Sequence, residues 1–329
     1  MNIIITSPII AKEEQFIEKV KKCKECNINI FRFNLSRLNS KKMEEELRKR
    51  CITIRRIIDN PKIIYDIPFP GKNPRMFRSV LREKFNKGEI IKCYNNHYSN
   101  TSSNYIDVDN LEKYFIHNKS YLIQDGEGII KVIRVSREEI TFKFENSFEL
   151  RSGKAILCER LIENSDCDQT IVENINRLKP EYVWFSFVKN LKFLPHFIEK
   201  IHYVPQYYFK IENEDGVNNI DNIMKAGEGI IVARGDLALN IKCKGLYEKQ
   251  QYITNVAHRE NKRVVVATGI LNSMKNMQIP SRAELVDIEL IVKNKCENIV
   301  LNTALMYADN LKKIVDLIKD IELNNINES

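Results

Sequence analysis

Residues 206–239 read QYYFKIENEDGVNNIDNIMKAGEGIIVARGDLAL, and this stretch decides the fold. The apolar runs QYYFKIE and GIIVA are typical of buried strands, and GVNNIDNIMKAG between them has the spacing of a helix. A strand, a helix and a second strand in this order predict two parallel strands joined by a crossover. The second strand leads into Arg234, Gly235 and Asp236, an order that favours a ligand site over a plain loop.

The same alternation of strand and helix patterns runs through much of the chain. Helical patterns separate the predicted strands, and one long helix is expected from the end of GIIVA through His258. About eight strand–helix units are the number that a (β/α)₈ TIM barrel requires, and such a barrel carries its active site at the carboxyl ends of the strands. We therefore predict an α/β barrel whose strands lie at 2–6, 28–35, 62–67, 182–188, 206–212, 229–233, 263–268 and 298–302.

Residues 76–158 interrupt this alternation of strand and helix patterns. They include the polar run YNNHYSNTSSNYIDV, the turn-like QDGEG and the alternating segments IIKVIRV and EITFKFE. Alternation of apolar and polar residues is typical of strands with one face in water. The sequence thus predicts a small inserted β domain at 76–158, and a barrel catalytic domain formed by 1–75 and 159–329.

The composition narrows the class of protein. The chain has 329 residues, of which 43% are hydrophobic and 29% are charged, so it can bury a full core. The net charge of +8 is spread along the chain, which favours anionic small molecules over nucleic acid as partners. No apolar run approaches the ~20 residues of a membrane span. The start, MNIIITSPII, lacks the basic region and cleavage site of a signal peptide, so we expect a cytoplasmic protein.

Eight cysteines raise the question of a metal site. Cys23 and Cys26 form a CxxC pair inside a Lys-rich helical pattern, and the other six supply no second pair at zinc spacing. We interpret the cysteines as reduced thiols.

Three segments carry a specific resemblance. FKIENEDGVNNIDNIM, GEGIIVARGDLAL and VVVATGILNSMKNMQIPSRAELVDIE resemble the core of the pyruvate kinase family, in the same order and at similar spacing. INIFRFNLSR resembles that family's Arg-x-Asn-x-Ser segment after the second strand. The resemblance covers about residues 1–75 and 165–320. It implies the barrel fold, with the inserted β domain where the family has its mobile lid.

Two carboxylates are the candidate metal ligands. Glu212 and Asp236 follow successive strands, which are neighbours in a barrel, so their side chains should converge. Oxygen ligands of this kind suit Mg²⁺ or Mn²⁺. The resemblance implies the same role, because the family holds its divalent metal with carboxylates at these positions.

Lys210 and Thr268 are the candidate catalytic residues, together with Arg32. Lys210 shares a strand face with Glu212 and could neutralise charge that develops on an enolate oxygen or a phosphoryl group. The resemblance implies that Lys210 assists phosphoryl transfer, that Thr268 lies near the methyl-forming carbon and that Arg32 contacts the transferring phosphate.

The opening stretch supplies the expected substrate carboxylate site. Gly235 and Asp236 open a helix, where backbone N–H groups attract anions and glycine admits a ligand close to the backbone. The resemblance implies that this turn holds the substrate carboxylate. We expect Arg234 to serve a structural ion pair instead.

The resemblance also implies a monovalent cation site and a nucleotide site. Asn34, Ser36 and Asp66 match the family's K⁺ ligands, while Arg75 and Lys154 are candidate nucleotide-binding residues for ATP or ADP. The family's Thr ligand after the Asp is Ile67 here, and the spacing to Arg75 is two residues longer, so K⁺ dependence is doubtful.

Further departures also affect the nucleotide side. Ser7 and Pro8 replace Ile-Gly-Pro of the first strand's end, Arg37 replaces a His, Gly269 replaces a Gln, and LNTAL replaces Ser-Gly-Glu-Thr. The sequence given ends at Ser329, so we expect no counterpart of the family's C-terminal allosteric domain.

Three functions stay open. The first is a divergent pyruvate kinase-like enzyme, a phosphotransferase that acts on phosphoenolpyruvate, pyruvate or a related 2-oxo acid, in a specialised biosynthetic pathway. The second is a metal-dependent lyase or decarboxylase that forms an enolpyruvate intermediate without a nucleotide. The third is a non-catalytic regulatory homologue. In each case the expected partner is a small molecule, without a nucleic-acid or membrane partner, and the protein is a candidate homodimer.

Overall fold

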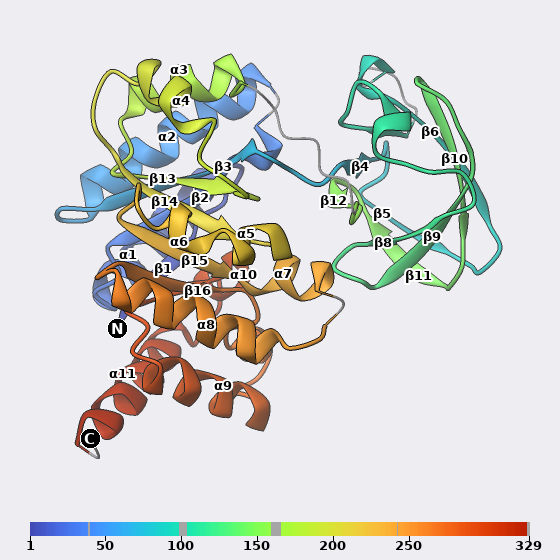
Figure 1. The fold of residues 1–329 in the computed structure, drawn as a ribbon. Coiled ribbons are helices and arrows are strands. Elements are labelled where there is room, and N and C mark those ends of the chain that lie inside the picture. The colour runs from blue at the N-terminus through green and yellow to red at the C-terminus, as the bar shows by residue number, and fades with distance from the viewer. Residues whose placement is uncertain (39, 99–103, 159–165, 242, 328–329) are drawn as a thin grey trace. The chain divides into compact units, whose positions relative to one another are not determined.

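The computed structural model describes residues 1–38, 40–98, 104–158, 166–241 and 243–327. Contacts divide the chain into two compact units (Figure 1). The first combines Met1–Pro70 with Ser165–Ser329, and the second is Gly71–Asn164. The first predicted domain limit, between residues 75 and 76, falls inside a strand of the second unit. The second predicted limit, between 158 and 159, meets residues 159–165, which lie outside the described residues.

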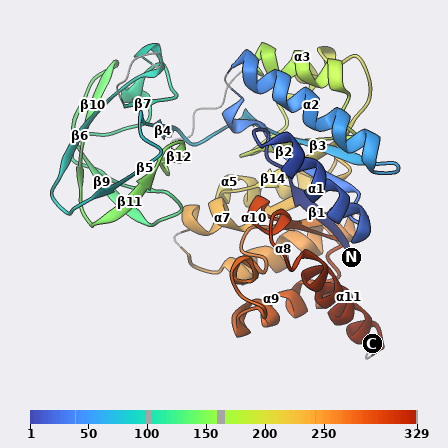
Figure 2. The same cartoon turned by 180° about the vertical axis from the view of Figure 1, so that it is seen from behind.

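Eight parallel strands close into a barrel in the first unit, which confirms the predicted fold class. Segments far apart in the sequence lie side by side, because β1 pairs with β17 and β3 pairs with β13 (Figures 1 and 2). In their order around the barrel the strands are β1 (Asn2–Thr6), β17 (Asn298–Leu301), β16 (Arg263–Ala267), β15 (Gly229–Ala233), β14 (Gln206–Ile211), β13 (Tyr182–Ser186), β3 (Lys62–Pro70) and β2 (Ile30–Asn34).

Helices follow the strands along the chain. None of them, within the described residues, is long and apolar enough to cross a membrane. They are α1 (Glu13–Glu25), α2 (Lys41–Ile57), α3 (Gln169–Leu178), α4 (Leu194–Glu199), α5 (Glu214–Asn218), α6 (Ile220–Ile223), α7 (Arg234–Asn240), α8 (Leu246–Arg259), α9 (Arg282–Lys293), α10 (Thr303–Met306) and α11 (Leu311–Asn327), with the short 3₁₀ helices η1 (Leu35–Arg37) and η4 (Asn272–Lys275).

The expected long helix through His258 is wrong. Two helices, α7 and α8, occupy that stretch, and Gly245 between them has a φ of 67°. A left-handed residue cannot continue a right-handed helix, and glycine adopts this conformation without steric cost. The pattern at 216–227 also forms two short helices, α5 and α6, rather than one.

The barrel interior is apolar in its middle and polar toward the carboxyl ends of the strands. Side chains alternate between the two faces of a strand, so every second residue points inward. The apolar interior is formed by one cluster: Ile4, Ile64, Trp184, Tyr208, Ile231, Ala233, Val265 and Val300. The intervening residues pack outward against the helices in the main core, as Phe185 and Phe209 do. One step further along the strands, the inward positions become polar, at Arg32, Asp66, Ser186 and Lys210.

Polar residues begin the helices that follow the strands. Asp168, Asn213 and Asn302 accept backbone N–H groups at the starts of α3, α5 and α10. Ser281 and Glu284 form a capping box at α9, and Glu284 also accepts the backbone N–H of Ser273 at 2.9 Å. Such caps satisfy the N–H groups that a helix start leaves unpaired, and they fix the loops at the carboxyl end of the barrel.

The described residues of the second unit form β-strands and two single-turn 3₁₀ helices, η2 (Asn96–Tyr98) and η3 (Leu111–Lys113), and the unit has its own hydrophobic core. The turn at Gln124, Asp125 and Gly126 has positive φ throughout and joins two antiparallel strands. A seven-stranded sheet has the order β12 (Lys154–Ala155), β4 (Arg75–Phe77), β7 (Tyr105–Ile106), β6 (Ile90–Tyr94), β10 (Glu139–Phe144), β9 (Gly128–Val135) and β8 (Ser120–Ile123), and a two-stranded sheet pairs β11 (Phe148–Arg151) with β5 (Arg82–Phe85).

The eight cysteines are free thiols. Cys23 and Cys26 are buried, and burial raises the pKa of the Cys23 thiol to about 12. Among the described residues, no group of three or more His, Cys, Asp or Glu side chains could hold a metal ion.

Candidate active site

Lys210 is at the centre of a charged cluster at the carboxyl ends of the strands. Its ammonium Nζ lies 2.9 Å from Oε1 of Glu212 and 3.3 Å from Oδ1 of Asp66. It also donates to Oγ of Ser186 at 3.2 Å. Burial acts to lower the pKa of Lys210, but the two carboxylates outweigh it and raise the pKa above the ordinary value. Lys210 is therefore a fixed positive charge at neutral pH.

Asp66 on β3 is held by two cations. Its Oδ2 accepts from Nε of Arg32 at 2.8 Å and from Nη2 of Arg32 at 2.6 Å. Its Oδ1 faces Lys210, and the Ser186 hydroxyl donates to it at 3.3 Å. Burial acts to raise the pKa of Asp66, but Lys210 and Arg32 prevail and lower it. Asp66 is thus ionised and both of its oxygens have partners.

Glu212 follows β14 and is only 1% exposed. Its Oε1 faces Lys210, and its Oε2 accepts the backbone N–H of Phe187 at 2.6 Å. Burial, together with repulsion from Asp236, raises the pKa of Glu212 to about 7, although Lys210 acts in the opposite direction. Burial is the largest of these influences, and the neighbouring Asp236 carboxylate adds to it.

Asp236 lies in the first turn of α7, after β15. It is close enough to Glu212 for its charge to raise the pKa of that carboxyl. The structure thus brings together the two side chains that the sequence predicts as metal ligands.

Arg234, which precedes Gly235 and Asp236, forms an ion pair with Asp287 of α9, at 2.5 and 2.8 Å. It also donates to the carbonyl oxygen of Thr268 through Nε at 3.0 Å and Nη2 at 2.7 Å. One guanidinium therefore connects the start of α7, the end of β16 and α9. This is a structural role, as the sequence suggests for Arg234.

Thr268 has an unusual backbone. Its φ is 79°, a left-handed conformation that is a genuine outlier for a β-branched residue. Its side chain packs on Gly235, where an added Cβ would lie 3.0 Å from Cγ2 of Thr268. The absence of a side chain at Gly235 and the hydrogen bonds from Arg234 hold Thr268 in this place. Strained residues of this kind cluster at functional sites.

Arg32 on β2 connects the cluster to the middle of the barrel. Besides its bonds to Asp66, its Nη1 donates to Oγ1 of Thr6 at 3.0 Å. Its guanidinium carbon lies 6.0 Å from the centre of the Trp184 ring, within the range of a cation–π contact.

Two of the three predicted cation ligands, Asn34 and Asp66, have other partners. Asn34 pairs with Asp66 in the strand register, but its Oδ1 accepts the backbone N–H of Ser36 at 3.0 Å and so caps η1. The carboxylate of Asp66 is shared between Arg32 and Lys210. A monovalent cation at this place would compete with two positive side chains.

The candidate nucleotide residues lie in the second unit. Arg75 on β4 and Lys154 on β12 belong to a pair of hydrogen-bonded strands. Nη1 of Arg75 donates to the carbonyl oxygen of Gly153 at 3.1 Å, and Nζ of Lys154 lies 3.1 Å from Oδ2 of Asp125. Lys154 is paired with Met76 and Arg75 with Ala155, so the two side chains point to opposite faces of the sheet.

Sequence reasoning missed two groups of the cluster. Ser186 bridges Lys210 and Asp66, and the N–H of Phe187 positions Glu212. A signal for Ser186 was present, because it is the inward-facing residue at the end of the strand YVWFS. No side-chain pattern could have shown the backbone donor at Phe187.

A closed parallel barrel with its charged cluster at the carboxyl ends of the strands defines a (β/α)₈ protein with its site in the usual place. Within this class, the family model described as the pyruvate kinase barrel domain matches residues 2–305. The chain belongs to the pyruvate kinase family.

Individual relatives are similar at modest identity. A pyruvate kinase of Borreliella burgdorferi is 24% identical over 318 residues, which cover 93% of this chain and 65% of the relative. One of Methanocaldococcus jannaschii is 31% identical over 227 residues, covering 66% of this chain and 47% of the relative. One of Thermotoga maritima is 25% identical over 283 residues, covering 82% and 60%. The chain spans less than two thirds of the length of these relatives.

Proposed function

We propose that the protein is a divergent pyruvate kinase-like enzyme that transfers a phosphoryl group between a nucleotide and a 2-oxo acid, in its enol form, of the phosphoenolpyruvate and pyruvate class. The observation that carries this proposal is the ion pair of Lys210 and Glu212, which is buried at the carboxyl end of the barrel beside Asp236. A buried lysine that stays charged suits the stabilisation of an enolate oxygen.

Glu212 and Asp236 would hold Mg²⁺ or Mn²⁺. The fit lies in their charges, because their mutual repulsion contributes to a raised pKa at Glu212, and a divalent cation would relieve it. Two carboxylates are also what Mg²⁺ takes from a protein when substrate oxygens and water complete its shell. When bound, the ion would polarise the substrate's oxygens as a Lewis acid.

The chain's own residues would bind the substrate and stabilise the charge that develops on it. Lys210 is positioned to face the enolate oxygen, since Asp66, Glu212 and Ser186 fix its ammonium from three sides. Arg32, anchored on Asp66 and Thr6, presents a second positive charge for a phosphoryl group. Thr268, held beside Gly235, would position a proton donor at the methyl-forming carbon.

A nucleotide-independent lyase is the second candidate. It is favoured by the pairing of Asp66 with Arg32 and Lys210, which places fixed positive charges where a monovalent cation would otherwise assist nucleotide chemistry. Enolate stabilisation by Lys210 is common to both functions, so the nucleotide decides between them.

Thermal shift with Mn²⁺ tests the two functions together. Pyruvate, oxalate, phosphoenolpyruvate, ADP and ATP are added separately, because a ligand that binds only the folded state raises the melting temperature. Stabilisation by oxalate and by a nucleotide supports the kinase. Stabilisation by oxalate alone supports the lyase. If neither stabilises the protein, both proposals fail and the regulatory homologue takes their place.

A further inference from the structure

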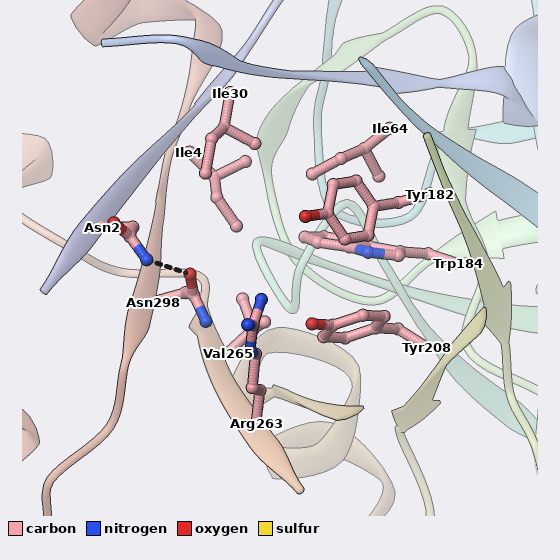
Figure 3. A pocket seen from close by; sticks show the side chains of 10 residues that line it. All are labelled: Asn2, Ile4, Ile30, Ile64, Tyr182, Trp184, Tyr208, Arg263, Val265 and Asn298. Carbon is pink, nitrogen blue, oxygen red and sulfur yellow. Dashed lines mark hydrogen bonds between the residues drawn. The ribbon is translucent and has the colours of Figure 1, made fainter. Parts of the chain in front are cut away.

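A cavity lies at the amino-terminal ends of the barrel strands, on the far side of Trp184 from the charged cluster. Its volume is about 50 Å³ (Figure 3). The aromatic rings of Tyr182, Trp184 and Tyr208 form one side, Asn2 and Asn298 lie on the other, and Arg263 reaches in between them. All of these residues belong to the barrel strands of the first unit.

The aromatic side of the cavity is ordered by packing. The rings of Tyr182 and Tyr208 are 5.6 Å apart at an interplanar angle of 78°, and those of Trp184 and Tyr208 are 6.3 Å apart at 33°. Gly229 on β15 makes this possible, because a Cβ there would lie 2.3 Å from Cε1 of Tyr208. A side chain at Gly229 would therefore displace the Tyr208 ring.

The cavity has one buried hydrogen-bond donor that lacks an acceptor, and a charged donor at its edge. The indole N–H of Trp184 is buried and has no hydrogen-bond partner among the described residues. Arg263 is exposed at the start of β16, donates a hydrogen bond to the Tyr208 hydroxyl, and forms no ion pair with a carboxylate in the described part of the chain. Its charge acts on Tyr208, where it works against the burial that raises the pKa of that hydroxyl to about 12. A buried donor without an acceptor is costly, which favours a ligand that accepts hydrogen bonds.

Three acidic residues around the strand starts limit the charge of such a ligand. Glu181 and Glu297 each accept a backbone N–H at 2.7 Å, from Ile63 and Val264 respectively. Glu228 is close enough to affect Tyr208. These carboxylates would repel a doubly charged phosphate more than a monoanion.

We propose that this cavity is a binding site for a small monoanion of the carboxylate class, with Arg263 and the Trp184 indole N–H as its donors. A planar carboxylate matches the fork of a guanidinium. The volume of about 50 Å³ exceeds the ~10–15 Å³ that a cavity needs to hold one water molecule, and it suits a head group of one or two carbons. The site requires no metal, no nucleotide and no catalytic activity, so it stands independently of the proposed function.

The chain carries its own reporter for this site. Trp184 is the single tryptophan among 329 residues, and it lines the cavity. Intrinsic fluorescence of the intact protein can therefore be titrated with sodium acetate at a constant ionic strength set by sodium sulfate. We expect a saturable change with a dissociation constant of about 1–10 mM, as suits a ligand of four non-hydrogen atoms. Acetamide, which has a similar shape without the charge, should give no such change.

Three variants locate the binding. Arg263→Gln should weaken acetate binding by about tenfold or more, since it removes the charged donor. Arg282→Gln, at an exposed position at the start of α9, changes the net charge equally and should leave binding intact. Lys210→Met should also retain it, because acetate that bound in the charged cluster above Trp184 would depend on Lys210.

Saturation-transfer NMR on the acetate methyl protons gives a second measurement that does not depend on the indole. Transfer in the wild type that is lost in Arg263→Gln supports the site. If transfer and fluorescence show no saturable binding, or if Arg263→Gln binds as the wild type does, the cavity holds water only and the proposal is overturned.

Discussion

Lys210 and Glu212 form a buried ion pair, with 2.9 Å between Nζ and Oε1, in which the lysine keeps its charge while the pKa of the carboxyl is raised to about 7. Burial favours the neutral form of each group, and their other neighbours decide whether it prevails. Lys210 also faces Asp66, whereas Glu212 is repelled by Asp236. The pair thus combines a fixed cation with an acid that titrates near neutral pH.

The fixed cation leads to the first prediction. Exchange of pyruvate methyl protons into D₂O needs only enolate formation, and Lys210 is placed to stabilise the negative oxygen. We expect Mn²⁺-dependent exchange, followed as loss of the methyl signal in proton NMR. Lys210→Met should slow it by about 10²-fold or more, as is typical when one such donor is lost.

Lys192→Met is the matched control, because Lys192 is exposed and outside the cluster. Circular dichroism must show that Lys210→Met is folded, since the change leaves Glu212 buried without its cation. Equal exchange rates in Lys210→Met and the wild type would remove Lys210 from the mechanism.

The pKa of Glu212 leads to the second prediction. Folding raises it from an ordinary 4.5 to about 7, so the folded state is favoured while Glu212 is protonated. This contribution of Glu212 to the free energy of unfolding is complete below about pH 4.5 and is lost as the pH rises through 7. A divalent cation has the opposite dependence, because it binds the ionised form. Below pH 7, Mn²⁺ affinity should therefore rise by about tenfold per pH unit and then level off.

Mn²⁺ titrations between pH 5.5 and 7.5, followed by electron paramagnetic resonance of the free ion, would measure this slope. Glu212→Gln should weaken binding and flatten the pH dependence. Asp236→Asn should weaken binding clearly while changing the slope less. If the Mn²⁺ affinity of the wild type does not change with pH, Glu212 is not a metal ligand.

The backbone of Thr268 supports a third prediction. Its φ of 79° strains a β-branched residue, and glycine adopts this conformation freely. Thr268→Gly should raise the free energy of unfolding by about 1 kcal/mol or more, measured by urea denaturation. The same substitution one residue earlier, Ala267→Gly, lies in a regular strand and should lower it by a comparable amount. Pyruvate proton exchange should fall in Thr268→Gly. A lower free energy of unfolding in Thr268→Gly than in the wild type would show that the backbone of Thr268 is not strained.

The partners of Asp66 lead to a fourth prediction. Its carboxylate is shared by Arg32 and Lys210, and Oδ1 of Asn34 accepts a backbone N–H. A K⁺ ion would have to displace or repel these groups. Once turnover is measured, we expect replacement of Na⁺ by K⁺ to change the rate by less than about twofold, which is under 0.5 kcal/mol. A strong activation by K⁺ would mean that the cluster rearranges around the ion.

Much of the barrel was predictable because its strands are buried on both faces. Parallel strands of this kind read as continuous apolar runs, as GIIVA and RVVVA do, and the helices between them have their own period. The shared face of Lys210 and Glu212 followed from the period of two along a strand. These features are local, so the sequence alone was sufficient.

Other features depend on contacts between distant segments. The break between α7 and α8 lies at Gly245, yet apolar residues at helical spacing continue on both sides of it. The left-handed Thr268 is contrary to the preference of a threonine, and it is held by Arg234, which lies 34 residues earlier. The bond from Phe187 to Glu212 joins the ends of two strands. Residue type carries no signal for a backbone donor of this kind.

The pairing of β4 with β12 has a consequence for how the barrel forms. Asp66 on β3 must meet Trp184 on β13, more than a hundred residues later, and the entropy lost in closing a chain grows with the logarithm of its length. The second unit brings its own two ends together, because Arg75 pairs with Ala155. Once it has folded, the free chain between β3 and β13 shortens to roughly 30 residues, which eases closure by about 1 kcal/mol. By folding first, the inserted unit therefore brings β3 and β13 closer together before they pair. Its early folding should set the order in which the two halves of the barrel are joined.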